Sequence, residues 1–307
     1  MSIPPELYEV NRRYLWGMCY RMTGNASDAD DLVQETFVKA LEHPPKRTDL
    51  PMRPWLVRVA LNLSRDLLRS RRRRQGDVWL PSPVPTEELD TPPSFEPSAA
   101  ETDSPMARYD MLESVSFAFL LALEALTPSQ RAVLLLRDVF DYSTAETAEA
   151  LGSSESSVKV TLLRSRRAMQ NYDRERTARG GAHSDLTSRA LEQFLLYLRA
   201  GNLEALEKLL TADVVSISDG GGEVAAALKP IYGRDKVLRL VIKTAERFGD
   251  SVGMLFRSLN GAPAVVFEAA APLPNHATRF TMHCEVDQSG LIRRLDFVIA
   301  PSKLARL

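Results

Sequence analysis

Hydrophobic residues follow two different spacings along this chain. In residues 1–77 and 111–172 they recur every three to four positions, which predicts helices through both blocks. Residues 186–307 begin with two helical patterns and then change to alternating apolar runs such as Phe280–Val286. Asp287–Gly290 follows that run and has the composition of a hairpin turn. We therefore expect two all-α domains followed by an α+β domain.

Two stretches of different composition separate these blocks. Residues 78–110 contain seven prolines, seven acidic residues and a single basic one. Because proline removes a backbone donor and disfavours helix at the preceding residue, this stretch predicts an extended linker of adaptable shape. Residues 173–185 form a shorter break, where Gly180 and Gly181 interrupt a charged run.

The composition indicates the class of protein and the compartment in which we expect it. Its 307 residues are 44% hydrophobic and 26% charged, which is ordinary for folded proteins. We find no secretory leader and no apolar run of about 18 residues, and two distant cysteines, Cys19 and Cys284, cannot form a disulfide framework. We expect a cytoplasmic protein, and its net charge of −1 means that any nucleic-acid contact must come from local basic stripes.

A helix is predicted over residues 28–43, directly after Ser27. Acidic side chains crowd its first turn, where the helix dipole favours negative charge. They suit docking on a basic protein surface, although capping and solvation also account for some of Asp28, Asp30 and Asp31. The apolar positions recur at helical spacing and predict the buried face: Ala29, Val33, Phe37, Ala40 and Leu41.

A second helix, residues 55–74, carries a basic stripe. The members of the stripe lie within about 40° of a common line on the helix: Arg58, Asn62, Arg65, Arg69 and Arg72. The opposite face is apolar: Leu56, Val59, Ala60, Leu63 and Leu67. A row of guanidinium groups can follow a phosphate backbone, but a solvated basic face is the alternative. The run Arg71–Arg74, without carboxylate partners in the sequence, favours nucleic acid. Trp55 either packs in the core or stacks on an opened strand.

A helix-turn-helix is predicted at residues 144–169. The first helix ends at Gly152, which can adopt the positive φ that reverses the chain, and Ser153 or Ser154 can cap the next helix. Such a unit places its second helix in a major groove, although an ordinary helical hairpin has the same pattern. The outward residues of the second helix mix cationic, polar and apolar groups: Ser156, Lys159, Val160, Leu163, Arg164, Arg166 and Arg167.

Three ordered segments resemble bacterial sigma factors of the extracytoplasmic-function group. Asp28–Phe37 (DADDLVQETF) is similar to region 2.2, which docks on the clamp of RNA polymerase. Pro54–Arg74 is similar to regions 2.3 and 2.4, which melt and read the minus-ten promoter element. Leu123–Met169 is similar to region 4, which reads the minus-thirty-five element. The resemblance implies an alternative sigma factor with a region 2 helical bundle and a region 4 helix-turn-helix.

The resemblance also implies the residues of each interface. Core polymerase would be bound by five residues of the 28–43 helix: Asp31, Leu32, Gln34, Glu35 and Phe37. The minus-ten element would be bound by Trp55, Arg58, Asn62, Arg65, Arg69 and Arg72. The minus-thirty-five element would be bound by Ser156, Lys159, Val160, Leu163, Arg164 and Arg166. The implied partners are the clamp and flap of core RNA polymerase and promoter DNA, with weak promoter binding by the free, monomeric chain.

The C-terminal block resembles a SnoaL-like cone, an α+β domain that a subset of these sigma factors carries. Two further segments are similar to that subset, Trp79–Pro83 in the linker and Asp219–Gly222, and Pro301–Leu304 matches more loosely. The linker departs at Ser82, where an acid is usual. The implied regulatory contacts within the chain are Trp79, Leu80, Pro81, Asp219, Gly220, Gly221, Gly222, Lys303 and Leu304.

SnoaL-like cones elsewhere are enzymes, so the titratable residues of this block need weighing. His283, Asp296, Asp219 and Glu285 are the candidates for a proton-abstracting group in an apolar pocket. We expect a tight turn at Asp219 and a regulatory domain with no catalytic residue, metal or cofactor. Two rivals remain: a ligand-sensing helix-turn-helix regulator that needs no polymerase, and a sigma factor whose cone is still enzymatic.

Overall fold

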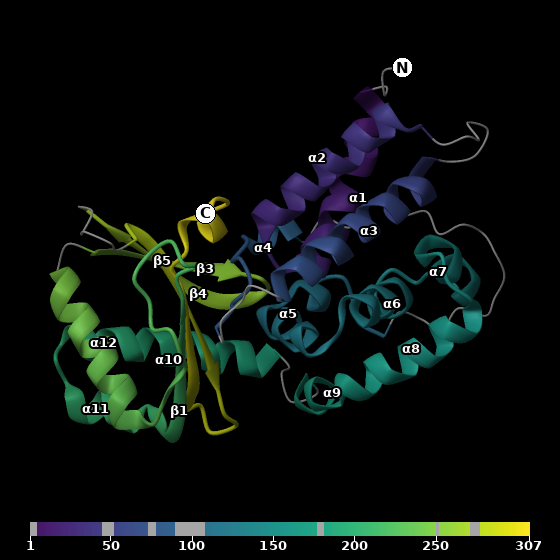
Figure 1. Ribbon diagram of the computed structural model, residues 1–307. Coiled ribbons are helices and arrows are strands. Elements are labelled where there is room, and N and C mark those ends of the chain that lie inside the picture. Colours follow the sequence, from purple (N-terminus) through teal and green to yellow (C-terminus); the bar gives the residue numbers. More distant parts are fainter. Residues whose placement is uncertain are drawn as a thin grey trace. The chain divides into compact units, whose positions relative to one another are not determined.

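The computed structural model describes residues 5–44, 52–72, 78–89, 108–176, 181–249, 252–270 and 277–307 (Figure 1). The chain divides into two compact units. The helical unit comprises Met1–Arg74 and Glu87–Tyr172, and the sheet unit comprises Gln75–Thr86 and Asp173–Leu307. A short helix, α4 (Thr86–Leu89), lies at one junction of the two units, and α9 (Gln170–Arg176) lies at the other.

Three long helices begin the helical unit: α1 (Pro5–Thr23), α2 (Ala26–Glu42) and α3 (Met52–Arg72). All three pack on one another, and α1 supplies fully buried side chains such as Tyr14 and Met18. The α2 helix begins two residues earlier than expected from a Ser27 cap. Its N-cap is Asn25, whose Oδ1 accepts hydrogen bonds from the backbone N–H of Ser27 and Asp28, at 3.0 and 3.2 Å.

The predicted helix-turn-helix is present in the second half of this unit. After α5 (Phe117–Ala122) come α6 (Pro128–Asp138), α7 (Thr144–Leu151) and α8 (Glu155–Ala168). Local capping sets their ends, because Ser143 and Glu146 form a capping box at α7 and Ser154 caps α8. Gly152 ends α7 in the left-handed conformation, with φ of +60°. The turn between α7 and α8 is therefore encoded within about ten residues.

Regions 1–77 and 111–172, which we treated as separate blocks, pack together within the helical unit. Two buried arginines, each under 5% exposed, join them. Arg21 of α1 donates from Nε to Ser114 Oγ at 2.7 Å and from Nη2 to the carbonyl of Met111 at 2.8 Å. Arg131 of α6 donates from Nη1 to the carbonyl of Met22 at 2.7 Å. Burial lowers the pKa of Arg21 to about 10, so it stays charged at neutral pH while bonded to uncharged acceptors.

A six-stranded mixed sheet forms the sheet unit, in the order β2-β1-β6-β5-β4-β3. The strands are β1 (Leu210–Asp219), β2 (Ile231–Tyr232), β3 (Val252–Leu259), β4 (Ala262–Ala269), β5 (Arg279–Val286) and β6 (Ile292–Val298). All pairs are antiparallel except β1 and β6, which are parallel. The expected turn at Asp287–Gly290 joins β5 and β6, with Asp287 Oδ1 accepting from the N–H of Ser289 and Leu291.

Three helices cover one face of this sheet: α10 (Gly181–Arg199), α11 (Leu203–Lys208) and α12 (Arg234–Phe248) (Figure 1). The buried core lies between them, with Phe194 of α10 and Val241 of α12 against Phe267 and Met282 of the sheet. This is the α+β architecture expected for the C-terminal block, with helices on one side of a mixed sheet.

Part of the expected linker belongs to the sheet unit. Residues 78–84 are extended as predicted, but Leu80, Ser82 and Val84 are fully buried rather than free to change shape. Val84 exchanges two hydrogen bonds with Asn260, both at 2.9 Å, and Pro85 bridges to Leu259. The continuous buried run Leu80–Pro85 and these hydrogen bonds hold this stretch on the domain, which composition alone did not reveal. The acidic Pro-rich residues 90–107 lie outside the described residues.

Candidate polymerase, promoter and linker sites

The outward face of α2 is a stripe of polar and apolar side chains. Asp31, Gln34 and Glu35 are exposed, as the sequence predicts for a docking surface. Val38 and Leu41, 49% and 47% exposed, continue the same face along the helix. We assigned Leu41 to the core, and Val38 was not singled out. Apolar side chains at this spacing on an exposed helix face are the signal that could have identified the C-terminal part of this surface.

Two of the five residues proposed for polymerase binding belong to the core instead. Leu32 and Phe37 are each 5% exposed, and the Phe37 ring lies 4.6 Å from that of Tyr8 in α1. They occupy the same stripe as Ala29 and Val33, which are buried as expected. Leu32 and Phe37 therefore hold α2 on the helical unit and do not form its accessible surface.

The basic stripe of α3 is only partly exposed. Arg58, Asn62 and Arg69 face outward, and Trp55 is half-buried. Arg65 is also half-buried, donates from Nη2 to Ser129 Oγ at 3.3 Å, and has a pKa lowered chiefly by burial. The side chain of Arg72 lies outside the described residues.

The basic stripe is only partly exposed because the buried face of α3 is rotated about the helix axis relative to the predicted face. Its fully buried members are Leu56, Val57, Ala60, Leu61, Ser64 and Leu68. Val59, Leu63 and Leu67, which we expected inside, are half-buried. The apolar residues of α3 outnumber those that one face can hold, so packing against α1, α2 and α6 selects the set.

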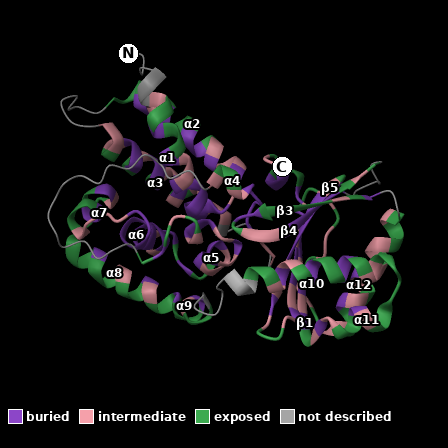
Figure 2. Cartoon of the chain, turned by 180° about the vertical axis from the view of Figure 1, so that it is seen from behind, coloured by how far each residue is buried: buried purple, intermediate pink, exposed green. Residues whose placement is uncertain are grey.

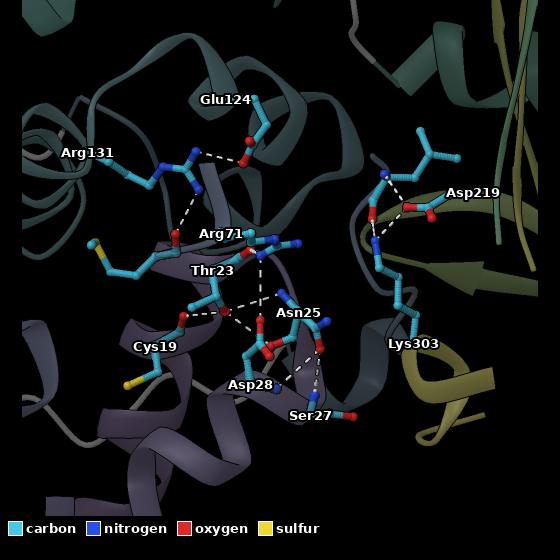
Figure 3. A network of polar contacts seen from close by, with 12 residues as sticks. Cys19, Thr23, Asn25, Ser27, Asp28, Arg71, Glu124, Arg131, Asp219 and Lys303 are labelled. Atoms are coloured by element: carbon cyan, nitrogen blue, oxygen red, sulfur yellow. Dashed lines mark hydrogen bonds and ion pairs between the residues drawn. The ribbon is translucent and has the colours of Figure 1, made fainter. Parts of the chain in front are cut away.

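The arginine run Arg71–Arg74 begins in the last turn of α3, and its first residue has a carboxylate partner. Arg71 Nη1 lies 3.5 Å from Asp28 Oδ2 and donates to the carbonyl of Thr23 at 3.0 Å (Figure 3). Arg71 therefore ties the end of α3 to the start of α2, and the expectation of a run without carboxylate partners is wrong for this residue. Arg73 and Arg74 lie outside the described residues.

Helix α8, the predicted recognition helix, has most of its predicted residues exposed to solvent (Figure 2). Its exposed members are Ser156, Lys159, Val160, Leu163, Arg164 and Arg167. Val160 and Leu163 are half exposed, which suits apolar contact with thymine methyl groups.

Arg166 is different from its neighbours on α8. Its Nε and Nη2 donate to the two carboxylate oxygens of Asp138, at 2.9 and 2.6 Å. The hydrogen bond to this carboxylate raises the pKa of Arg166, and Asp138 itself is buried. Arg166 therefore fastens α8 to α6 and is not free for DNA in this structure.

The basic helix α3 packs against the first helix of the helix-turn-helix within the helical unit. Helices α3 and α7 are in contact, and a Cβ added at Gly152 would lie 3.6 Å from Arg58 Nη2. The guanidinium group of Arg58, a member of the basic stripe, therefore lies beside the turn of the helix-turn-helix. In this conformation the exposed part of α3 and the recognition unit belong to one compact body.

Most of the proposed regulatory residues meet in the sheet unit. Lys303 Nζ lies 2.6 Å from Asp219 Oδ2 and donates to the carbonyl of Leu80 at 2.6 Å, and the Leu80 N–H donates to the same Asp219 oxygen at 2.7 Å (Figure 3). The Lys303 and Asp219 side chains are only 6% and 5% exposed. Lys303 Nζ also lies 4.8 Å from the centre of the Trp79 ring. We call Leu80, Asp219 and Lys303 the linker anchor.

The glycines after Asp219 form the expected tight turn. Asp219 Oδ1 accepts from the N–H of Gly221 at 2.9 Å, and Gly221 has a φ of +61°. A Cβ at Gly221 would come within 2.8 Å of Ala300, and one at Gly220 within 2.6 Å of the carbonyl of Val224. Glycine therefore lets the turn approach the segment that precedes Lys303. Gly222, with positive φ, is exposed, whereas Pro81 and Leu304 are buried beside the anchor segments.

A cavity lies between the helices and the sheet of this unit, and the four candidate catalytic residues do not line it. Its lining includes Phe280, Met282 and Phe297. His283 and Asp296 alternate with these residues along β5 and β6, and so lie on the opposite face of the sheet. Burial lowers the pKa of His283 to about 3 and raises that of Asp296 to about 6, although Asp296 accepts from Arg294 Nε at 2.8 Å.

The bundle with its basic helix and the capped helix-turn-helix together define a sigma-70-type transcription factor. Residues 7–74 match the family model of Sigma-70 region 2, and residues 116–169 match that of Sigma-70, region 4. Over 246 residues the chain is 31% identical to the ECF RNA polymerase sigma factor SigJ of Mycobacterium tuberculosis, covering 79% of this chain and 73% of that protein. The chain belongs to the ECF RNA polymerase sigma factors.

Two further comparisons agree with this assignment. The M. tuberculosis ECF sigma factor SigG is 38% identical over 223 residues, covering 67% of this chain and 59% of SigG. The crystal structure of M. tuberculosis SigJ has the same fold, with a TM-score of 0.66 and 24% identity over 97% of this chain and 96% of that one. The sigma-factor expectation is therefore confirmed, and the regulator that works without polymerase is set aside.

Across the described residues, every helix is too short or too polar to span a bilayer.

Proposed function

We propose that this sigma factor docks on the polymerase clamp through the exposed face of α2, reads two promoter elements with α3 and α8, and is regulated by its own C-terminal domain through the linker anchor. The anchor is the observation that supports the regulatory part. It joins two residues of the C-terminal domain, Asp219 at the end of β1 and Lys303 in the turn Pro301–Leu304, to Leu80 in the segment that connects regions 2 and 4.

Reading both promoter elements requires the helical unit to open. Elements centred at minus ten and minus thirty-five are about 85 Å apart at 3.4 Å per base pair. Helices α3 and α7 are in contact here, so both elements cannot be read in this conformation. The segment that connects regions 2 and 4 must move for this opening, and the anchor holds Leu80–Pro85 of that segment on the sheet unit. The anchor therefore restrains the opening.

Transcription with purified core polymerase tests this regulation. Lys303→Met removes the anchor's ammonium group while keeping a long apolar side chain, and we expect promoter-dependent output to rise. The matched control is Lys208→Met, because Lys208 pairs with Glu204 in an exposed position of the same unit. Equal or lower output from Lys303→Met than from Lys208→Met would contradict a restraining anchor.

The docking surface on α2 is tested by a matched pair of apolar positions. Val38 on α2 and Val10 on α1 are 49% and 51% exposed, so glutamate at either position should leave the fold intact. We expect Val38→Glu and Gln34→Ala to weaken binding to core polymerase at least tenfold. We expect Val10→Glu to bind like the parent chain. Similar affinities for all four proteins would place the polymerase contact elsewhere.

We also propose that the C-terminal domain acts by binding and not by catalysis. The cavity lining contains neither His283 nor the three carboxylates weighed with it, among the residues that the structure describes. An enzyme of the proton-abstracting type needs such a group inside the cavity. The test uses His283→Asn and Asp296→Asn variants that still fold. Retained promoter-dependent transcription by both would support a domain that acts by binding. Loss of a turnover activity in either variant would oppose it.

A further inference from the structure

The cavity of the sheet unit is large enough for a small molecule. It measures about 690 Å³, within the range of roughly 300–1,000 Å³ typical of ligand sites. Its walls come from α10, α12 and the covered face of the sheet, and six representative lining residues are Leu195, Leu240, Phe248, Met254, Phe280 and Phe297. Such a space is far larger than the packing gaps of an ordinary core.

The lining indicates the kind of ligand. Apolar side chains dominate it, and Phe267 and Phe280 stack at 4.6 Å between ring centres, which provides a flat aromatic wall. Polar groups are few inside: the Thr244 hydroxyl donates to the carbonyl of Leu240, and the largely buried Ser218 lies on β1. A ligand with many polar groups would lose its hydration without replacement partners.

Charged lining residues lie at the ends of two helices. Arg199 ends α10, and Glu246 and Arg247 lie in the last turn of α12, all of them exposed. Their position at the outer edge of the lining marks where the cavity meets solvent. The chemistry therefore favours a hydrocarbon or aromatic body that is buried, with any polar group left at this edge.

The cavity shares a wall with the linker anchor. Ser218 lines the cavity, and the next residue along β1, Asp219, is in the anchor. Ile299 also lines the cavity while its N–H donates to the carbonyl of Asp219 at 2.8 Å. Ala225–Ala227, which follow the glycine turn, form another part of the lining. A molecule that moves this wall must move the backbone that carries Asp219.

We propose that the cavity binds a small, largely apolar molecule and that its occupancy changes how tightly the anchor holds the linker. The coupling half of this proposal rests on the regulatory role given above, whereas the binding half does not. A ligand shifts the anchor only by its difference in affinity for the held and released states, and linkage makes the effect reciprocal. Breaking the anchor must then change the affinity of the ligand by the same factor.

Binding is tested on the full chain with the neutral apolar fluorophore 1-N-phenylnaphthylamine. We expect saturable binding of one molecule per chain. Ala245→Phe places a ring in the cavity from α12, and Met254→Trp fills it from β3. Either variant, if folded by circular dichroism, should weaken binding at least tenfold. Ala205→Phe, on α11 and outside the lining, should not. Absent saturable binding, or full binding by both filled variants, would overturn the site.

Coupling is tested with the same probe on the anchor variant. We expect the affinity for the fluorophore to change at least threefold in Lys303→Met and to stay unchanged in Lys208→Met. Equal affinity in the parent and Lys303→Met would overturn the coupling. Transcription by Lys303→Met without the probe reports on the anchor alone, so failure of the regulatory proposal is distinguishable from failure of this one.

Discussion

Substituting Lys303 by methionine should release the linker from the C-terminal domain. In the parent chain Lys303 Nζ bonds to Asp219 Oδ2 and to the carbonyl of Leu80, both at 2.6 Å. Methionine keeps much of the apolar contact but leaves the Asp219 carboxylate buried without its cation. The backbone N–H groups of Leu80 and Gly221 still donate to that carboxylate, so the damage is a lost ion pair and not a complete loss of partners.

The free-energy cost of the Lys303→Met substitution follows from the burial of the Lys303–Asp219 ion pair. Removing one member of a buried ion pair costs about 3–5 kcal/mol, and the two remaining donors place this case near about 3 kcal/mol. Because about 1.4 kcal/mol corresponds to a factor of ten, local opening should become roughly a hundred times more frequent. An exposed pair such as Lys208–Glu204 is worth at most about 0.5 kcal/mol, so Lys208→Met should change opening less than about threefold.

Native-state hydrogen exchange measures this opening directly. The amides to follow are Leu80, which donates to Asp219, and Val84, which donates to Asn260 Oδ1 at 2.9 Å. Both should exchange about a hundred times faster in Lys303→Met. The double variant with Asp219→Asn should recover part of the protection, because it removes the buried unpaired charge. Unchanged exchange at both amides, or strictly additive effects in the double variant, would refute the reasoning.

Four further outcomes are expected. Arg164→Ala should lower promoter-dependent transcription about tenfold or more, since the exposed guanidinium is available to a base or phosphate. Arg131→Met should lower the melting temperature of the helical unit, because it breaks a buried bond to the carbonyl of Met22. Burial raises the pKa of the Cys19 thiol to about 12 and also raises that of Cys284, so neither should react readily with Ellman's reagent at pH 8 until urea is added. With its pKa lowered to about 3 by burial, the His283 ring should stay neutral in NMR spectra between pH 7.5 and 5, and its contribution to the free energy of unfolding should fall as the pH drops from 6.5 toward 3.

Each of these outcomes has a result that would contradict it. Normal open-complex yield by Arg164→Ala would remove α8 from promoter reading. A melting temperature unaffected by Arg131→Met would mean that the two helical regions are not held together as the structure indicates. Fast reaction of both thiols in the native chain would show that Cys19 and Cys284 are not buried in solution. Titration of the His283 imidazole near pH 6 would show the same for His283. Arg166→Ala is a useful comparison, since losing its bond to Asp138 should affect stability as well as transcription.

Local signals in the sequence determined the parts of the fold that depend on few neighbours. The helix-turn-helix was predictable because Gly152 and Ser154 set its turn through hydrogen bonds within a few residues. The Asp287–Gly290 hairpin and the alternation of β5 were predictable for the same reason. The exposed polar residues of α2 also followed from helical spacing, since charged side chains rarely lie in a core.

Only the tertiary structure decided which apolar and cationic residues are used internally. Leu32 and Phe37 pack in the core while Val38 and Leu41 face solvent, although helical spacing alone allowed each of them either place. Arg71 and Arg166 pair with Asp28 and Asp138, partners brought near by folding and not by sequence proximity. A pattern within one helix cannot show which neighbouring helix will cover it, and that choice decides burial and charge pairing.

The linker anchor shows the same division most clearly. Its residues were singled out from short motifs in three distant segments, yet composition predicted that the segment containing Leu80 would be loose. Folding instead buries Leu80–Pro85 and brings Lys303 to within 2.6 Å of Asp219. A buried ion pair needs both partners and the surrounding low-polarity walls to be assembled at once, so its energy exists only in the folded chain. The sequence supplies the residues of the anchor, and long-range packing of the domain makes them a contact.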